Sequence, residues 1–139
     1  MSVSAGIFRW TEAYRVNIEI LDRQHQELID TINELDAALR AGEGNSALPA
    51  LFDKLIEYAN EHFAAEESLM LKHEFPGVFT HQAQHEIFRQ KLDAFISAHN
   101  QRKSGVPVSL MLFLHEWLKD HLLKTDKLYS PFLNARGVR

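Results

Sequence analysis

Two pairs of potential metal ligands stand at helical spacing in this sequence. His62 and Glu66 are four residues apart, and so are His81 and His85. On a helix this spacing places two side chains about 40° apart around the axis and about 6 Å apart along it. Imidazole and carboxylate groups are common ligands of transition metals. Each pair is therefore expected to chelate a metal ion from one helix face.

Three further candidate ligands lie outside these pairs. His25 falls between the apolar residues Leu21 and Leu28, and His121 lies in the last apolar segment of the chain. Asp126 comes five residues after His121, which on an ideal helix turns it about 140° away. Asp126 can join the other ligands only if its helix ends or distorts after His121.

The set of donor atoms indicates two iron ions. It holds nitrogen and oxygen donors and no sulfur, because the chain has no cysteine. Seven donors are too many for one tetrahedral zinc ion, and they suit two six-coordinate ions that share bridges. Two bridging carboxylates and five terminal histidines leave room for an oxygen bridge and one open position. We therefore expect two iron ions (Fe²⁺/Fe³⁺) with a bridging oxo or hydroxo group.

Four segments of helical periodicity must position these residues. They span roughly residues 19–41, 46–72 and 78–102 and the chain from Pro107 onward. Ser46 is expected to cap the second helix, and Pro107 suits the first turn of the fourth. The short connections predict an all-α fold, an antiparallel up-down-up-down four-helix bundle. Residues 1–18 are expected to form an irregular arm, and the chain from Leu128 a short helical tail.

The predicted bundle brings the candidate ligands to one level. The start of the first helix, the later part of the second, the start of the third and the end of the fourth share one end of such a bundle. Those places hold His25, His62, Glu66, His81, His85 and His121. Burying these polar groups without a partner is costly, and a metal removes that cost. The alternative is a bundle with a few satisfied core histidines, whose common level would be a coincidence.

In these motifs the sequence resembles the hemerythrins, in particular the single-domain bacterial ones. The match is carried by His25, HFAAE at 62–66, HQAQH at 81–85 and HLLKTD at 121–126. It extends from Trp10 to Phe132. The resemblance implies a single hemerythrin-like domain over residues 1–139.

The resemblance also implies a role for each ligand. His81, His85 and His121 would hold one iron, His25 and His62 the other, with Glu66 and Asp126 as bridges. Dioxygen would bind end-on at the open position of the second iron. The pocket over that position would be lined by Leu28, Phe63, Trp117, Leu118 and Leu122. An apolar lining keeps water and protons away from the bound gas.

The other three histidines are not expected to bind the metal. His99 lies about 21 Å along its helix from His85 and is expected at the core edge or the surface. His73 lies about 10 Å past Glu66 along the second helix, too far to bind the metal. We expect a structural role for it, and the alternative is a place around the ligands or in a proton path. His115 is about 120° from His121 around their helix and is expected to face solvent.

The ligand set favours a reversible dioxygen binder, for storage, delivery or buffering, over an enzyme. Oxygen-activating enzymes of this architecture use more carboxylates and fewer histidines. The alternatives are a di-iron redox enzyme (oxidase, peroxidase or nitric-oxide detoxification) and an oxygen or redox sensor that acts through a partner. Dioxygen is the expected ligand, with nitric oxide as the alternative. The protein partner would be an oxygen- or electron-handling protein.

The composition argues against other classes of protein. The net charge of −4 gives no case for binding nucleic acid or an anionic membrane. The longest apolar stretch, from Leu110 to Leu114, is too short for membrane insertion. The N-terminus shows no basic start followed by an apolar run, so no secretory signal is expected. The expected location is the cytoplasm.

Overall fold

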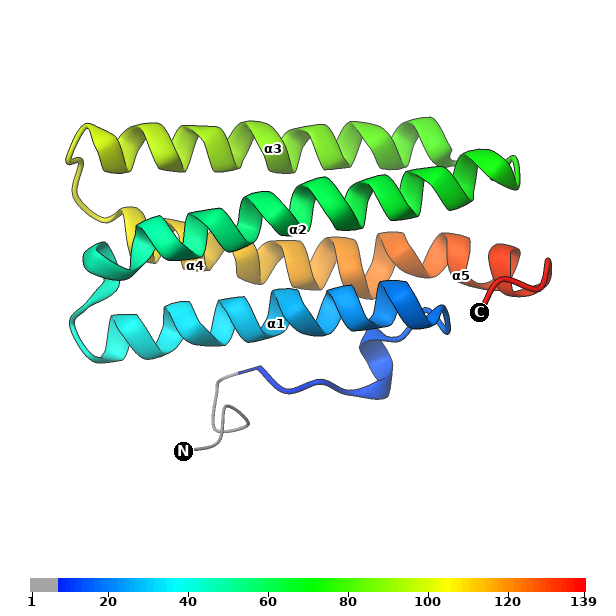
Figure 1. Ribbon diagram of the computed structural model, residues 1–139, viewed down its shortest axis with the longest axis horizontal. Coiled ribbons are helices and arrows are strands. Elements are labelled where there is room, and N and C mark those ends of the chain that lie inside the picture. The colour runs from blue at the N-terminus through cyan, green and yellow to red at the C-terminus, as the bar shows by residue number, and fades with distance from the viewer. Residues whose placement is uncertain (1–7) are drawn as a thin grey trace.

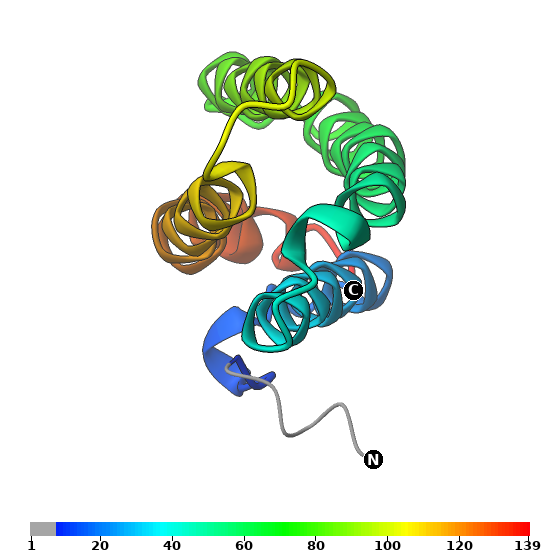
Figure 2. The same cartoon turned by 90° about the vertical axis from the view of Figure 1, so that its left-hand side faces the viewer.

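The computed structural model describes residues 8–139, which form helices and no strands. The bundle consists of α1 (Glu19–Arg40), α2 (Gly44–Lys72), α3 (Val78–Asn100) and α4 (Val106–Trp117). The fourth helix continues through a π-helical segment, η3 (Leu118–Thr125), into α5 (Asp126–Asn134). Successive helices are antiparallel (Figure 1) and surround a common axis (Figure 2). The predicted four-helix bundle is confirmed. None of the helices in the described range is long and apolar enough to cross a membrane.

Local sequence signals fix the helix ends. Gly105 precedes α4 with a φ of 76°, in the left-handed region that glycine adopts without strain. Pro107 lies in the first turn of α4, as predicted. Ser46 does not cap α2, which begins at Gly44. Ser46 lies inside the first turn of α2, and its hydroxyl donates to the carbonyl of Glu43 at 3.0 Å. The prediction of a cap at Ser46 is therefore wrong.

The apolar stripes of the helices face inward and form two clusters. The larger cluster includes residues such as Leu28, Leu55 and Leu110, and the smaller includes Leu21, Met70 and Tyr129. On α1 the polar His25 lies between Leu21 of the small cluster and Leu28 of the large one. Each fully buried leucine contributes roughly 1.5–3 kcal/mol relative to an exposed one. The packing of apolar residues on both sides thus holds the helices at a fixed spacing around a polar layer.

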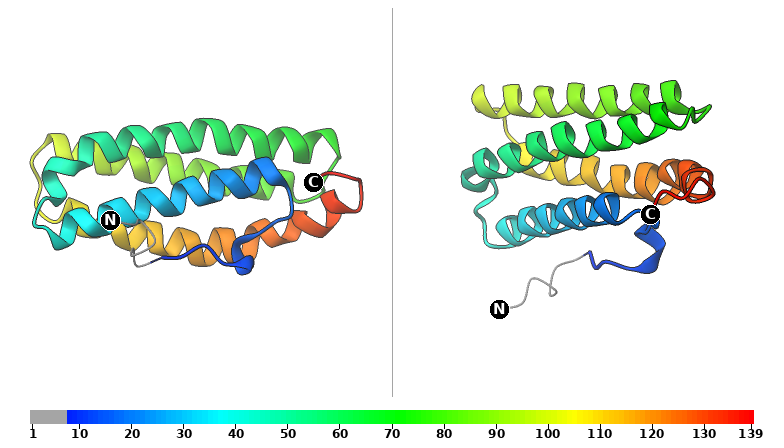
Figure 3. Two further views of the ribbon diagram at one scale, coloured as in Figure 1. Left: turned by 60° about the horizontal axis from the view of Figure 1, so that its bottom comes forward. Right: turned by 45° about the vertical axis from the view of Figure 1, so that its right-hand side comes forward.

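The described part of the N-terminal arm lies along the bundle. Residues 8–18 are irregular apart from a short 3-10 helix, η2 (Glu12–Tyr14). The Asn33 side chain of α1 accepts from the Phe8 amide at 2.9 Å and donates to the Phe8 carbonyl at 2.7 Å. Figure 3 shows the arm passing beside the helices before it enters α1. The predicted irregular arm is present from residue 8, and residues 1–7 lie outside the described residues.

Candidate metal centre

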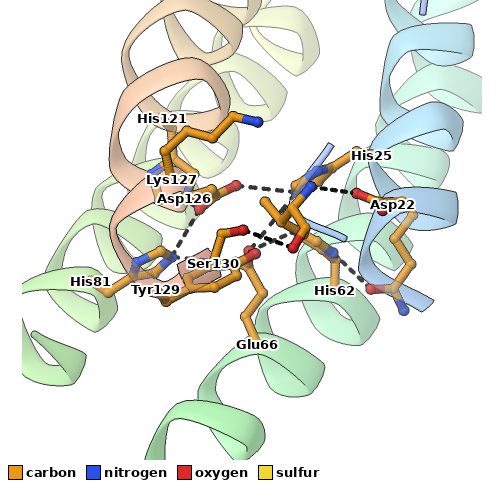
Figure 4. Close-up of polar contacts among 12 residues, drawn as sticks. Asp22, His25, His62, Glu66, His81, His121, Asp126, Lys127, Tyr129 and Ser130 are labelled. Atoms are coloured by element: carbon orange, nitrogen blue, oxygen red, sulfur yellow. Dashed lines mark hydrogen bonds and ion pairs between the residues drawn. The ribbon is translucent and has the colours of Figure 1, made fainter. Parts of the chain in front are cut away.

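Five imidazoles and two carboxylates meet inside the bundle. The predicted ligands, none of them more than 2% exposed, are His25, His62, Glu66, His81, His85, His121 and Asp126. They come from α1, α2, α3, η3 and α5. Figure 4 shows that side chains from these separate elements point toward a shared centre. The structure thus brings all seven predicted residues together.

The donor atoms form two overlapping groups. One consists of Glu66, His81, His85 and His121, and the other of His25, His62, Glu66 and Asp126. Within each group the donor atoms lie within 4.8 Å of one another. Glu66 belongs to both groups: its Oε1 is 3.0 Å from His85 Nε2, and its Oε2 is 3.3 Å from His62 Nε2. The arrangement therefore suits two metal ions that share a carboxylate.

The π-helical segment η3 brings Asp126 into the centre. Because hydrogen bonds in a π-helix close five residues apart, His121 and Asp126 lie on about the same face. Asp126 Oδ1 lies 3.0 Å from His121 Nε2, and Oδ2 lies 3.1 Å from His25 Nε2. The Thr125 hydroxyl follows the same period and donates to the carbonyl of Asp120 at 3.1 Å. The distortion that Asp126 requires is present.

Several buried polar atoms of the centre have no hydrogen-bond partner in the described structure. They are both ring nitrogens of His25, Nε2 of His62 and His121, and both carboxylate oxygens of Asp126. A buried polar atom without a partner costs about 1–3 kcal/mol. Each of these atoms can act as a metal donor, and nitrogen and oxygen donors without thiolate suit iron. The residues therefore fit two iron ions.

The close packing of charged and buried groups shifts the pKa values of the clustered side chains. Burial lowers the pKa of His25, but the nearby carboxylates of Asp126 and Glu66 outweigh it and raise the pKa to about 10. The same balance raises the pKa of His81 to about 9. Burial keeps the pKa of His62 below its usual value. Burial raises the pKa of both carboxyl groups, but the neighbouring imidazoles outweigh it and hold both well below their usual range. The carboxylates stay charged and attract a cation.

Three side chains support imidazole rings of the centre from behind. The pairs are Gln24 with His62 (2.7 Å), Glu67 with His85 (2.7 Å) and Gln84 with His121 (2.9 Å), each joining a side-chain oxygen to Nδ1. Because these oxygens only accept, each Nδ1 carries the proton and Nε2 keeps its lone pair for a metal. None of these three residues was among the predicted site residues. In the sequence each of the three stands directly beside a predicted ligand, and this position is the signal that could have found them.

The residues expected to line the ligand pocket are buried in one apolar cluster. They are Leu28, Phe63, Trp117, Leu118 and Leu122. Phe63 lies flat on the His85 ring, with 3.8 Å between ring centroids, and Trp117 lies flat on the His121 ring at 3.9 Å. The two aromatic walls thus contact histidines of the three-histidine group.

Two buried tyrosines contact the centre. Tyr58 stacks on His62 with 5.0 Å between ring centroids, and its hydroxyl accepts from Trp117 Nε1 at 3.3 Å. The Tyr129 hydroxyl donates to Glu66 Oε2. Burial, and then the negative charges of the carboxylates, raise the pKa of both phenols well above the usual value. Both tyrosines are therefore neutral hydrogen-bonding groups.

The other three histidines belong to neither donor group of the described residues. His73 and His99 are half-buried, and His99 packs edge-on against Phe52. His115 is exposed and packs edge-on against Phe8. All three therefore lie outside the buried cluster of seven predicted ligands.

Similarity to known proteins covers nearly the whole chain. A family model described as Hemerythrin HHE cation binding domain matches residues 16–133. A bacteriohemerythrin of Methylococcus capsulatus is 29% identical over 131 residues, covering 94% of this chain and 99% of that protein. A bacteriohemerythrin of Clostridium acetobutylicum is 26% identical, covering 88% of this chain and 98% of that protein. A wild-type hemerythrin crystal structure is 30% identical with a TM-score of 0.80, covering 91% of this chain and 98% of that one.

Proposed function

Because the chain belongs to the family of hemerythrin HHE cation-binding domains, which hold a di-iron centre, we propose that it binds dioxygen reversibly at such a centre. The role would be storage, delivery or buffering of the gas. The observation that carries the proposal is the make-up of the buried cluster. Its two overlapping donor groups consist of five imidazoles and two carboxylates.

Each ligand has a place in this proposal. His81, His85 and His121 would hold one iron and His25 and His62 the other, and Glu66 and Asp126 would serve both. The division is supported by the two donor groups that share Glu66. With two histidines in place of three, the second iron would be the one left with a position for dioxygen. When bound, the iron pair supplies the electrons that dioxygen binding needs.

The residues around the centre keep it dry. Leu28, Phe63, Leu118 and Leu122 are at most 2% exposed. An apolar lining gives water no hydrogen-bond partner, whereas a small neutral gas needs none. The proposed part of these side chains is to exclude water and protons from the open position.

The chemistry of the donors favours release of the gas over its further reduction. Di-iron enzymes built on bundles use four carboxylates and two histidines, and anionic donors stabilise higher oxidation states of iron. Here only Glu66 and Asp126 are anionic donors. Among the described residues, the expected pocket lining contains no carboxyl group that could protonate reduced dioxygen. The pKa of Tyr58, raised by burial, makes that phenol a poor acid.

Gas cycling tests the proposal. The protein is loaded anaerobically with Fe(II), exposed to air and then purged with argon while the visible absorption is followed. A band that forms in air and disappears on purging, over several cycles, is the expected result. If hydrogen peroxide or an oxidised reductant accumulates faster than the gas is released, the protein is a redox enzyme and the proposal fails.

A further inference from the structure

The three outer hydrogen bonds follow the order of the helices. In each pair, the outer residue lies on one helix and the histidine on the next. The outer residues are Gln24 of α1, Glu67 of α2 and Gln84 of α3. His25 on the first helix does not follow this pattern, because its buried Nδ1 has no partner in the described structure. The imidazoles are therefore supported unequally.

Glu67 differs from the other two outer residues in charge. Its Oε2 accepts from His85 Nδ1 at 2.7 Å, while its Oε1 accepts from Gln82 Nε2 at 3.4 Å. The Glu67 side chain is 21% exposed, so it lies at the edge of the bundle and the His85 ring behind it is fully buried. Phe63 covers one face of the same ring. The geometry fixes His85 from two sides and places a carboxylate behind it.

A carboxylate that accepts a hydrogen bond from Nδ1 of an imidazole changes how strongly Nε2 of the same ring binds a metal. The charged acceptor draws the Nδ1 proton toward itself, which makes Nε2 a stronger electron donor. A stronger donor binds a metal more tightly and favours its more highly charged state. Outer partners of this kind are worth about 10–100-fold in metal affinity. A neutral glutamine oxygen has a smaller effect, because its hydrogen bond is not charge-assisted.

We propose that Glu67 increases the difference between the two irons beyond that of three histidines against two. The iron bound by His81, His85 and His121 is supported by one carboxylate and one amide, and the other iron by a single amide. The first iron therefore binds more tightly and loses an electron first. Glu67 acts through His85, so it is a positioning residue. The inference rests on the two-iron centre of the proposed function and does not depend on dioxygen binding.

The substitution Glu67→Gln tests the inference, since it removes the charge and keeps an oxygen acceptor. Anaerobic titration with Fe(II) measures the two dissociation constants, and titration of the loaded protein with ferricyanide measures the first one-electron potential. The tighter dissociation constant is expected to rise about 10–100-fold while the weaker one stays unchanged. The potential is expected to rise, by about 59 mV for each tenfold loss in the ratio of ferric to ferrous affinity.

Two further variants control for charge and position. Glu86→Gln removes the same charge from the residue next to His85, but the Glu86 side chain is 58% exposed and faces Arg89. It should leave both constants and the potential unchanged. Gln24→Glu moves a carboxylate behind His62, so it should tighten the weaker site and reduce the difference between the irons. If Gln24→Glu does not fold, Gln84→Glu adds a second carboxylate behind the tighter site and should enlarge that difference.

The outcomes separate this inference from the proposed function. If two irons bind and Glu67→Gln leaves the constants and the potential unchanged, or weakens both sites equally, the inference is wrong and the proposed function stands. If the unsubstituted protein binds fewer than two irons, the proposed function itself fails, and the inference fails with it. A correct fold of each variant is checked by circular dichroism of the metal-free protein.

Discussion

The metal-free centre holds protons that a metal must displace. With pKa values raised to about 10 and about 9, His25 and His81 are protonated at neutral pH. Because both values are raised above 6.5, their contribution to the stability of the metal-free fold is complete below that pH. It is lost as the pH rises through about 9 and 10. Iron needs the same nitrogens in their neutral form.

Iron binding is therefore expected to release protons. At neutral pH the release should be at least two per chain, one each from His25 and His81, and the apparent affinity should rise with pH up to about 10. Calorimetry of Fe(II) binding in buffers of different ionisation enthalpy counts the released protons. An uptake of protons, or no exchange, would contradict the protonation of these two histidines.

One pocket residue tests the need for a dry lining. Leu122 is fully buried, whereas Leu123 beside it is 36% exposed. Leu122→Gln places an amide in the apolar cluster, which costs about 1–3 kcal/mol of unfolding free energy and attracts water. The oxygenated protein should then lose its visible band irreversibly several-fold faster in air. Leu123→Gln is the matched control. Equal rates in the two variants would show that Leu122 does not protect the open position.

At the scale of the helices, η3 decides whether Asp126 reaches the centre. A π-helical segment accommodates one more residue than the α-helix it interrupts. Without that residue Asp126 would follow His121 by four positions and stay on the same face at about 40°. The position of Asp126 relative to His121 thus depends on the length and helix type of the segment, and not on any particular side chain within it.

Removing one exposed residue from η3 is expected to be tolerated. Deletion of Lys124 should convert the segment to an α-helix, keep His121 and Asp126 together and preserve binding of two irons, counted by metal analysis. Deletion of the exposed Ala83 between two ligands of α3, a regular α-helix, should rotate the rest of that helix by about 100° and abolish binding. If both deletions abolish binding, η3 has a role beyond accommodating the extra residue.

The helices could be predicted closely from the sequence, but the π-helix could not. Apolar periodicity and the turns around Gly105 fix the long helices to within a few residues, since both signals are local. Asp126 at five residues from His121 fits no α-helical period, so only the family resemblance pointed to it. Gln24 and Glu67 were missed because their partners lie on neighbouring helices, where no spacing along one helix can reveal a contact.

In the molecule as a whole, the fold and the metal stabilise each other. The bundle buries donor atoms that have no partner in the described protein, and a metal that binds only the folded state supplies one. At a free concentration 100 times the dissociation constant, such a ligand adds about 2.7 kcal/mol to the free energy of unfolding. The arm adds to the same fold, because its backbone at Phe8 is bound to Asn33.

Loss of the metal should therefore weaken the entire bundle. A chelator is expected to lower the thermal midpoint, and added Fe(II) under anaerobic conditions is expected to raise it in a concentration-dependent way. Asn33→Ala should lower the midpoint of loaded and metal-free protein equally, since it removes two hydrogen bonds of the arm and leaves the centre intact. A midpoint that does not depend on Fe(II) would mean that the cluster needs no metal.

Counting the irons on the folded chain tests the two-iron centre most directly. The metal-free protein is titrated anaerobically with Fe(II), desalted and analysed for iron and zinc. Two irons per chain are predicted, and fewer in Glu66→Gln, because Glu66 belongs to both donor groups. A single iron per chain, or one tightly retained zinc that excludes iron, would contradict the two-iron centre.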